Sequence, residues 1–150
     1  MKLTLLFSIL FITNILSAQS TTDTTTVESS AHTYNGIEFF DGTWQEALFE
    51  ARATKKLVFI DCYTSWCKPC IWMIKEVFTD KKVGDFFNKR FISLKRNMEK
   101  GEGRKLKKIY HPMSTYPTFL FLDDKGQVIK RKVGALDVDS FLELAKSVVK

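Results

Sequence analysis

The stretch Thr64-Ser65-Trp66-Cys67-Lys68-Pro69-Cys70 decides the fold of this chain. It follows the apolar run 57–60 and precedes the amphipathic run 71–78, so we predict a strand, a tight turn and the start of a helix. At the first turn of a helix, unpaired backbone N–H groups and the positive end of the dipole favour a thiolate over a thiol. Pro69 suits this position, because the N–H that proline lacks has no partner there. A C-x-x-C pair in this context indicates a redox pair that cycles between dithiol and disulfide.

Two other uses of the cysteine pair are alternatives. A zinc site needs four ligands, and the chain adds only Cys62, His32 and His111, which are far apart in sequence. A purely structural disulfide between Cys67 and Cys70 would enclose only two residues and would constrain the unfolded chain very little. We therefore expect a redox pair with no metal and no other cofactor.

The residues around the pair resemble those of the thioredoxin-like family. Residues 66–70, Trp-Cys-Lys-Pro-Cys, are similar to the thioredoxin active site, with Lys68 in place of its glycine. Asp61 lies six residues before Cys67, where thioredoxins carry a buried aspartate. Residues 116–118, Tyr-Pro-Thr, resemble the cis-proline loop that packs beside the cysteines in this family.

Two further segments extend the resemblance. Residues 132–136 resemble the family's last strand and the glycine that follows it, so the likeness spans Leu57 to about Val149. The pattern from Tyr63 to Asp80 is similar to that of the C-terminal domain of the periplasmic reductase DsbD. The resemblance therefore implies an exported bacterial thiol-disulfide oxidoreductase.

The resemblance also implies the fold class, a thioredoxin-like three-layer α/β/α sandwich with a central mixed sheet. Hydrophobic periodicity and capping residues independently favour an α/β order along the chain. Helices are expected over 44–54, 68–78, 80–88, 104–110 and from 137 onward, and strands over 57–62, 91–95, 118–122 and 127–133.

The expected roles of the cysteines follow from thiol chemistry. Cys67, nearest the helix N-terminus and expected to be the more exposed, is the nucleophile that attacks a partner's disulfide. Cys70 then resolves the mixed disulfide. The resemblance assigns Asp61 to proton transfer with Cys70, whereas the alternative is a buried aspartate satisfied by backbone donors. Alternation along the strand places Cys62 on the opposite face, where we expect an inert thiol rather than a disulfide partner of Cys67.

Five residues are expected to contact the partner protein. Trp66 should shield the pair and offer a flat apolar surface, unless it packs in the core. Lys68 should favour the thiolate and make the protein less reducing than thioredoxin, while Pro69 lies between the cysteines. By resemblance, Tyr116 lines the binding groove and Pro117 is cis and exposes the Tyr116 backbone to a bound peptide.

The first residues predict export. Residues 1–18 have a positive start, an apolar run and a small residue before a cleavage point, the pattern of a signal peptide. Residues 19–35 form a Ser/Thr-rich linker that is expected to be disordered, and residues 36–150 form the thioredoxin-like domain. We therefore expect a periplasmic or secreted protein.

The net charge of +6 does not indicate nucleic-acid binding, because no aromatic-basic stripe accompanies it. The basic run 104–108 could indicate an anionic partner, but a solvated helix face is the favoured interpretation.

Three functions remain open from the sequence. The leading hypothesis is an exported reductase of disulfide-bonded proteins, monomeric and recharged by a membrane electron donor. The second is a disulfide-forming oxidant or isomerase. The third, of another class, is a redox-inactive binding or chaperone module on a thioredoxin scaffold.

Overall fold

The computed structural model describes residues 35–149; the predicted signal peptide and residues 19–34 of the predicted linker lie outside the described residues. None of the helices in the described part is long and apolar enough to cross a membrane. The elements are α1 (Trp44–Thr54), β1 (Leu57–Tyr63), α2 (Lys68–Trp72), a π-helical turn η1 (Met73–Val77), α3 (Lys81–Arg90), β2 (Phe91–Asn97), α4 (Gly103–Ile109), β3 (Thr118–Leu122), β4 (Val128–Val133) and α5 (Val138–Lys146).

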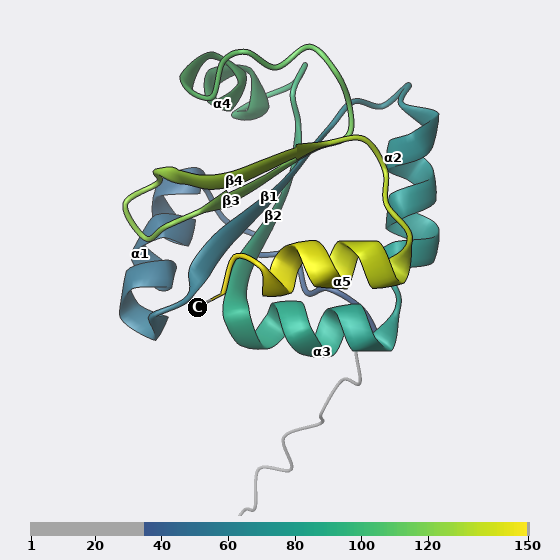
Figure 1. Cartoon of the computed structure of the whole chain (residues 1–150). Helices are drawn as coiled ribbons and strands as arrows, with labels where there is room; N and C mark the ends of the chain where they lie inside the picture. Colours follow the sequence, from purple (N-terminus) through teal and green to yellow (C-terminus); the bar gives the residue numbers. More distant parts are fainter. Residues whose placement is uncertain (1–34, 150) are drawn as a thin grey trace, which may run out of the picture. The chain divides into compact units, whose positions relative to one another are not determined.

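Four strands form one mixed sheet in the order β2-β1-β3-β4 (Figure 1). β1 pairs with β2 in parallel, and the β1–β3 and β3–β4 pairs are antiparallel. The turn at 123–126, with Gly126 at a φ of 82°, joins β3 to β4 as a hairpin, as the sequence predicts. The order of elements and the mixed sheet confirm the predicted thioredoxin-like fold class.

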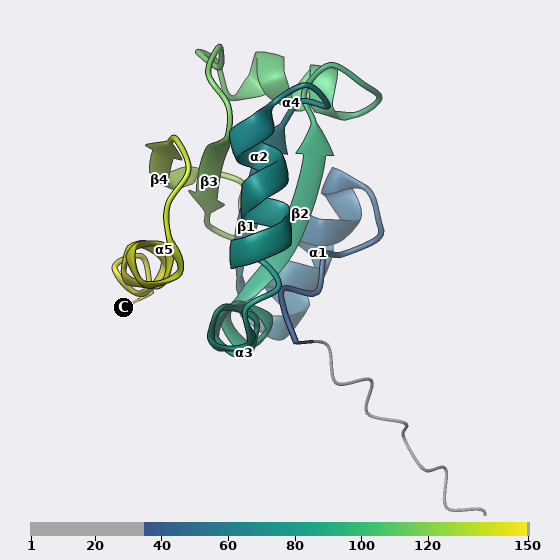
Figure 2. The same ribbon diagram turned by 90° about the vertical axis from the view of Figure 1, so that its right-hand side faces the viewer.

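Helices cover both faces of the sheet (Figure 2). One face packs against η1, α3 and α5 through a cluster rich in phenylalanine, and α2 lies over the same face (Figure 2). Its centre is Phe59 of β1, and the rings of Phe87 and Phe141 stack there at 4.8 Å between centroids. The other face packs against α1 and α4. β1 is buried on both sides, so Asp61 and Cys62 near its C-terminal end lie in the interior.

Local signals set the helix starts. The Thr43 hydroxyl accepts from the Glu46 N–H, and the Glu46 carboxylate accepts from the Thr43 N–H, which is the predicted capping box of α1. Asp80 and Asp137 cap α3 and α5.

The main difference from the expectation is that the active-site helix passes into η1 after Trp72 instead of remaining α-helical. Element bounds also differ by one or two residues: β1 runs to Tyr63, α3 to Arg90 and β2 to Asn97, and α4 begins at Gly103.

Candidate active site

The cysteine pair lies at the start of α2, as predicted. Cys67 is the N-cap residue and forms a disulfide with Cys70, with sulfurs 2.05 Å apart. The Cys70 N–H also points at the Cys67 sulfur, 3.2 Å away. Pro69 occupies the first turn, and Lys68 begins the helix with its side chain exposed. In the disulfide form both cysteines are buried, with Cys67 2% and Cys70 1% exposed. We expected Cys67 to be the more exposed of the two, and the difference is only this small.

Asp61 is a buried acid without a partner. It lies in β1 on the same face as Phe59, which is the face covered by α2, and only 1% of it is exposed. Neither carboxyl oxygen has a hydrogen-bond partner in the described part of the chain, so the alternative of an aspartate satisfied by backbone donors is wrong. Burial raises the pKa of Asp61 to about 7, against an opposing effect of the Lys95 ammonium. Near neutral pH this carboxyl can therefore both give and take a proton.

The structure brings the redox motif and the proline loop together. The rings of Trp66 and Tyr116 meet edge to face, with centroids 6.2 Å apart. Trp66 is 65% exposed, so core packing does not explain it. The Tyr116–Pro117 peptide is cis, as the resemblance implies, and Pro117 itself is buried. Trp66 and Tyr116 thus form an aromatic corner beside the cysteines.

Two residues at this corner were missed in the sequence. The indole N–H of Trp66 donates to both carboxyl oxygens of Glu99, at 3.1 Å each. The Lys107 ammonium lies 5.6 Å from the centroid of the Tyr116 ring. For the contact with Glu99, the sequence offered only one signal, the indole N–H of Trp66, which needs an acceptor. The sequence does not indicate which carboxylate accepts this hydrogen bond.

The exposed apolar side chains of α2 were only partly anticipated. Ile71 and Trp72 were placed in an amphipathic run, but both point to solvent, 42% and 44% exposed. With Trp66 they give the start of the helix three large apolar side chains at the surface. Such side chains around a buried disulfide offer a contact surface for another chain.

Cys62 lies apart from the pair. Its thiol is free and buried among the residues that face α1 and α4. Burial, together with the Asp61 carboxylate, raises the pKa of this thiol, and Arg131 opposes the shift. The alternative disulfide with Cys67 is wrong, since Cys67 pairs with Cys70.

A family model described as thioredoxin-like matches residues 40–124, more than half of the chain. The chain belongs to the thioredoxin-like family. Thioredoxin H5 of Arabidopsis thaliana is 33% identical to it over 92 residues, which is 61% of this chain and 71% of the plant protein.

Two solved structures extend this likeness. A candidate disulphide-isomerase from Bacteroides thetaiotaomicron is 45% identical, with a TM-score of 0.68 over 77% of this chain and 95% of that one. The C-terminal domain of Neisseria meningitidis DsbD, at 19% identity, shares the fold with a TM-score of 0.59 over 75% of this chain and 98% of its own.

Family, fold and cysteine pair agree on the chemistry. This thioredoxin-like chain is a thiol-disulfide oxidoreductase whose pair is Cys67 and Cys70.

Proposed function

We propose that this thioredoxin-like protein reduces disulfide bonds of other proteins outside the cytoplasm. The observation that carries the proposal is Asp61, a fully buried carboxyl with a pKa of about 7 that has no hydrogen-bond partner among residues 35–149. It lies on the sheet face under α2 (Figure 2). Burying an unpaired carboxylate costs several kcal/mol of folding free energy. A role in proton transfer would explain why the protein carries this destabilising group.

In the first step of the proposed reaction, the Cys67 thiolate attacks one sulfur of the partner's disulfide. A mixed disulfide forms, and the partner's other sulfur leaves as a thiolate that takes a proton from solvent. The N-cap position of Cys67, with the Cys70 N–H 3.2 Å from its sulfur, supports a negative charge on that sulfur.

In the second step the Asp61 carboxylate accepts the proton of the Cys70 thiol. The Cys70 thiolate then attacks the Cys67 sulfur and displaces the partner's remaining thiolate. Two electrons pass to the partner, which becomes a dithiol, and the protein is left with the Cys67–Cys70 disulfide.

The aromatic corner supplies the proposed contacts with the partner. Trp66 shields the pair and presents an exposed ring, and Tyr116 stands beside it at the cis-proline bond. An extended segment of the partner would lie along Tyr116 and Pro117, while Lys68 and Pro69 border the disulfide from the start of α2.

The compartment and the partners complete the proposal. Residues 1–18 have the pattern of a signal peptide, which supports export to the periplasm or beyond. Disulfides persist in such compartments, so a reductase there must receive electrons, and we propose a membrane protein as the donor. The protein acts as a monomer on disulfide-bonded proteins.

A second candidate function is disulfide isomerisation. The specific observation in its favour is the 45% identity to the Bacteroides protein described as a candidate disulphide-isomerase. Both activities need the Cys67 thiolate, but an isomerase releases its substrate without a net transfer of electrons.

Insulin reduction with dithiothreitol as the electron source tests the proposal. The full-length protein should accelerate reduction, and Cys67→Ser should abolish the acceleration. Cys70→Ser, reduced and then mixed with insulin after the dithiothreitol is removed, should accumulate a mixed disulfide. Cys62→Ala, on the other face of the sheet, is the matched control and should remain active. Activity that survives Cys67→Ser would refute the mechanism, and rearrangement of scrambled disulfides without net reduction would favour the isomerase.

A further inference from the structure

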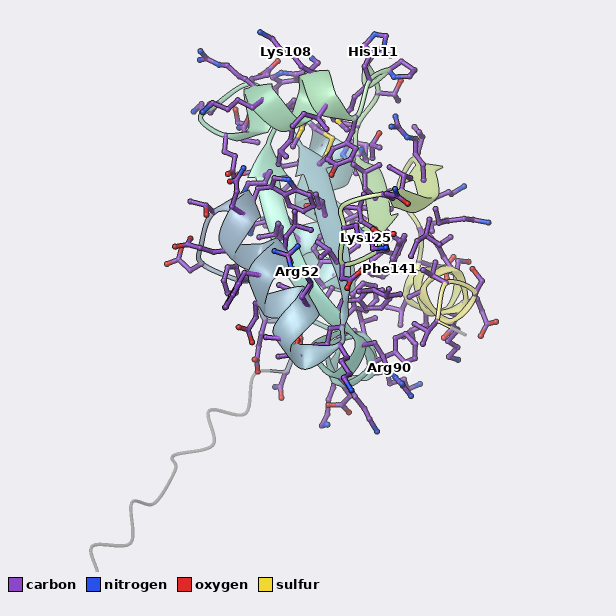
Figure 3. The ribbon with its side chains drawn as sticks, turned by 90° about the vertical axis from the view of Figure 1, so that its left-hand side faces the viewer. Arg52, Arg90, Lys108, His111, Lys125 and Phe141 are labelled. Atoms are coloured by element: carbon purple, nitrogen blue, oxygen red, sulfur yellow. A yellow bond between two sulfur atoms is a disulfide. The ribbon has the colours of Figure 1, made fainter. Side chains whose placement is uncertain are left out.

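A groove next to the aromatic corner has no part in the proposed chemistry. It lies between the turn after β2 and helix α4, and its volume is about 430 Å³. We call it the α4 groove. α4 crosses the same end of the sheet at which α2 begins (Figure 1), and Lys108 and His111 stand at that end of the molecule (Figure 3). Its lining residues are Met98, Glu99, Arg104, Lys107, Lys108 and His111.

The α4 groove is positively charged. Arg104, Lys107 and Lys108 line it, and neither lysine forms an ion pair with any residue in the described part of the chain. Among the described residues, the only acid in the lining is Glu99, whose carboxylate already accepts from the Trp66 indole. The buried Met98 side chain contributes an apolar wall. The groove therefore suits a ligand that carries carboxylates together with some apolar surface.

Two residues of the α4 groove contact the aromatic corner. Glu99 lines it and bonds to Trp66, the residue before Cys67. Lys107 lines it and lies over the ring of Tyr116, the residue before Pro117. A chain segment held in the groove would thus touch the same aromatic corner as a disulfide presented to Cys67.

We propose that the α4 groove binds an acidic segment of the protein whose disulfide exchanges with Cys67 and Cys70. This inference rests on the proposed function. The basic run 104–108, which the sequence alone favours as a solvated helix face, would then select among disulfide-bonded proteins. The attraction acts before the exchange step, so it changes the rate of encounter and the affinity rather than the chemistry.

The test uses three synthetic cystine peptides that differ only in one flanking run of aspartate, serine or lysine. At low ionic strength, with dithiothreitol as the electron source, the wild-type protein should reduce the aspartate peptide with a kcat/KM roughly tenfold above that of the lysine peptide, since each exposed ion pair changes binding a few-fold. The ratio should shrink as salt screens the charges. Equal kcat/KM for all three peptides would overturn the inference.

Charge reversal locates the effect. Lys107→Glu combined with Lys108→Glu should remove or invert the preference for aspartate. The matched control, Lys82→Glu with Lys125→Glu, makes the same change of net charge on α3 and on the β3–β4 turn and should keep the preference. If both double variants lose it equally, the overall charge and not the groove is responsible, and the inference fails.

Binding without exchange separates this inference from the proposed function. The same peptides with serine in place of both cysteines should bind the wild-type protein in calorimetry, the aspartate peptide most tightly. If no cystine peptide is reduced but the aspartate peptide still binds most tightly, the reductase proposal is wrong and the inference that the groove binds acidic segments is supported. If the cystine peptides are reduced but the serine peptides bind equally whatever their charge, the inference about the groove is wrong and the reductase proposal is supported.

Discussion

The Trp66 indole N–H is held by the Glu99 carboxylate, with both oxygens 3.1 Å from the nitrogen, across 33 residues of sequence. Glu99 is itself fixed by its neighbours: its N–H donates to the Asn97 side chain, and its carbonyl accepts from Arg104. The turn after β2 thus sets the orientation of an exposed aromatic ring that borders the redox pair.

Removing this acceptor should free the Trp66 ring. We expect Glu99→Ala to cost about 1 kcal/mol of stability, the usual net value of one such hydrogen bond, and to lower kcat/KM for a protein disulfide a few-fold. Glu99→Gln keeps an acceptor oxygen and should behave nearly as wild type. The Trp66 indole N–H resonance in NMR reports the bond directly. An unchanged resonance in Glu99→Ala would show that the contact does not position the ring in solution.

Asp61 should make the protein less stable as the pH rises. Its folded-state pKa of about 7 lies above the ordinary value, so between roughly pH 4 and 7 the folded state holds a proton that the unfolded state has lost. The free energy of unfolding should fall across this window and level off above it. Asp61→Asn should remove this slope and be more stable than wild type at pH 8 by roughly 1–3 kcal/mol, after the cost of its own buried amide. Urea unfolding at several pH values measures it.

Asp137 is the matched control, because its pKa is shifted downward whereas that of Asp61 is shifted upward. A hydrogen bond from the Ser140 N–H lowers the pKa of this exposed carboxyl, so its contribution to stability is lost as the pH falls. Asp137→Asn should therefore leave the slope between pH 5 and 7 as in wild type. A wild-type protein whose stability does not decline across that window would contradict the assignment of a raised pKa to Asp61.

Lys68 should tune the redox balance. Its ammonium favours the Cys67 thiolate and so stabilises the dithiol form. Lys68→Glu should make the reduction potential more negative by about 20–40 mV, a modest change because the side chain is exposed. Lys75→Glu, exposed further along in η1, is the control and should shift the potential much less. A shift of Lys68→Glu toward more positive values would refute this role.

Gly103 should be intolerant of any side chain. A Cβ there would lie 1.9 Å from the Asn97 carbonyl oxygen, so the turn that carries Glu99 would have to move. We expect Gly103→Ala to cost about 2–3 kcal/mol and to disturb the Trp66 contact. At Gly101 a Cβ meets nothing within 4 Å, and only the φ of 49° opposes it, so Gly101→Ala should cost about 1 kcal/mol. Thermal unfolding compares the two, and equal losses would count against the steric account.

Signals that act within a few residues predicted much of this fold. The capping box at Thr43 and the cap at Asp80 set the starts of α1 and α3. Alternation along β1 placed Asp61 and Cys62 on opposite faces.

Features that depend on distant contacts were not predictable. The π-helical turn η1 carries the same apolar pattern as an α-helix would. Ile109, although apolar, lies exposed on α4 because that short helix turns only one side to the sheet. The bond from Trp66 to Glu99 joins segments that only the fold brings together.

The reduction potential of the Cys67–Cys70 pair, measured by equilibration against glutathione, tests the central claim most directly. A reductase should have a strongly negative value, close to the roughly −270 mV of thioredoxin and raised from it only by Lys68. A value at or above about −180 mV, the range of disulfide isomerases and oxidants, would contradict the proposal of a reductase and favour disulfide isomerisation instead.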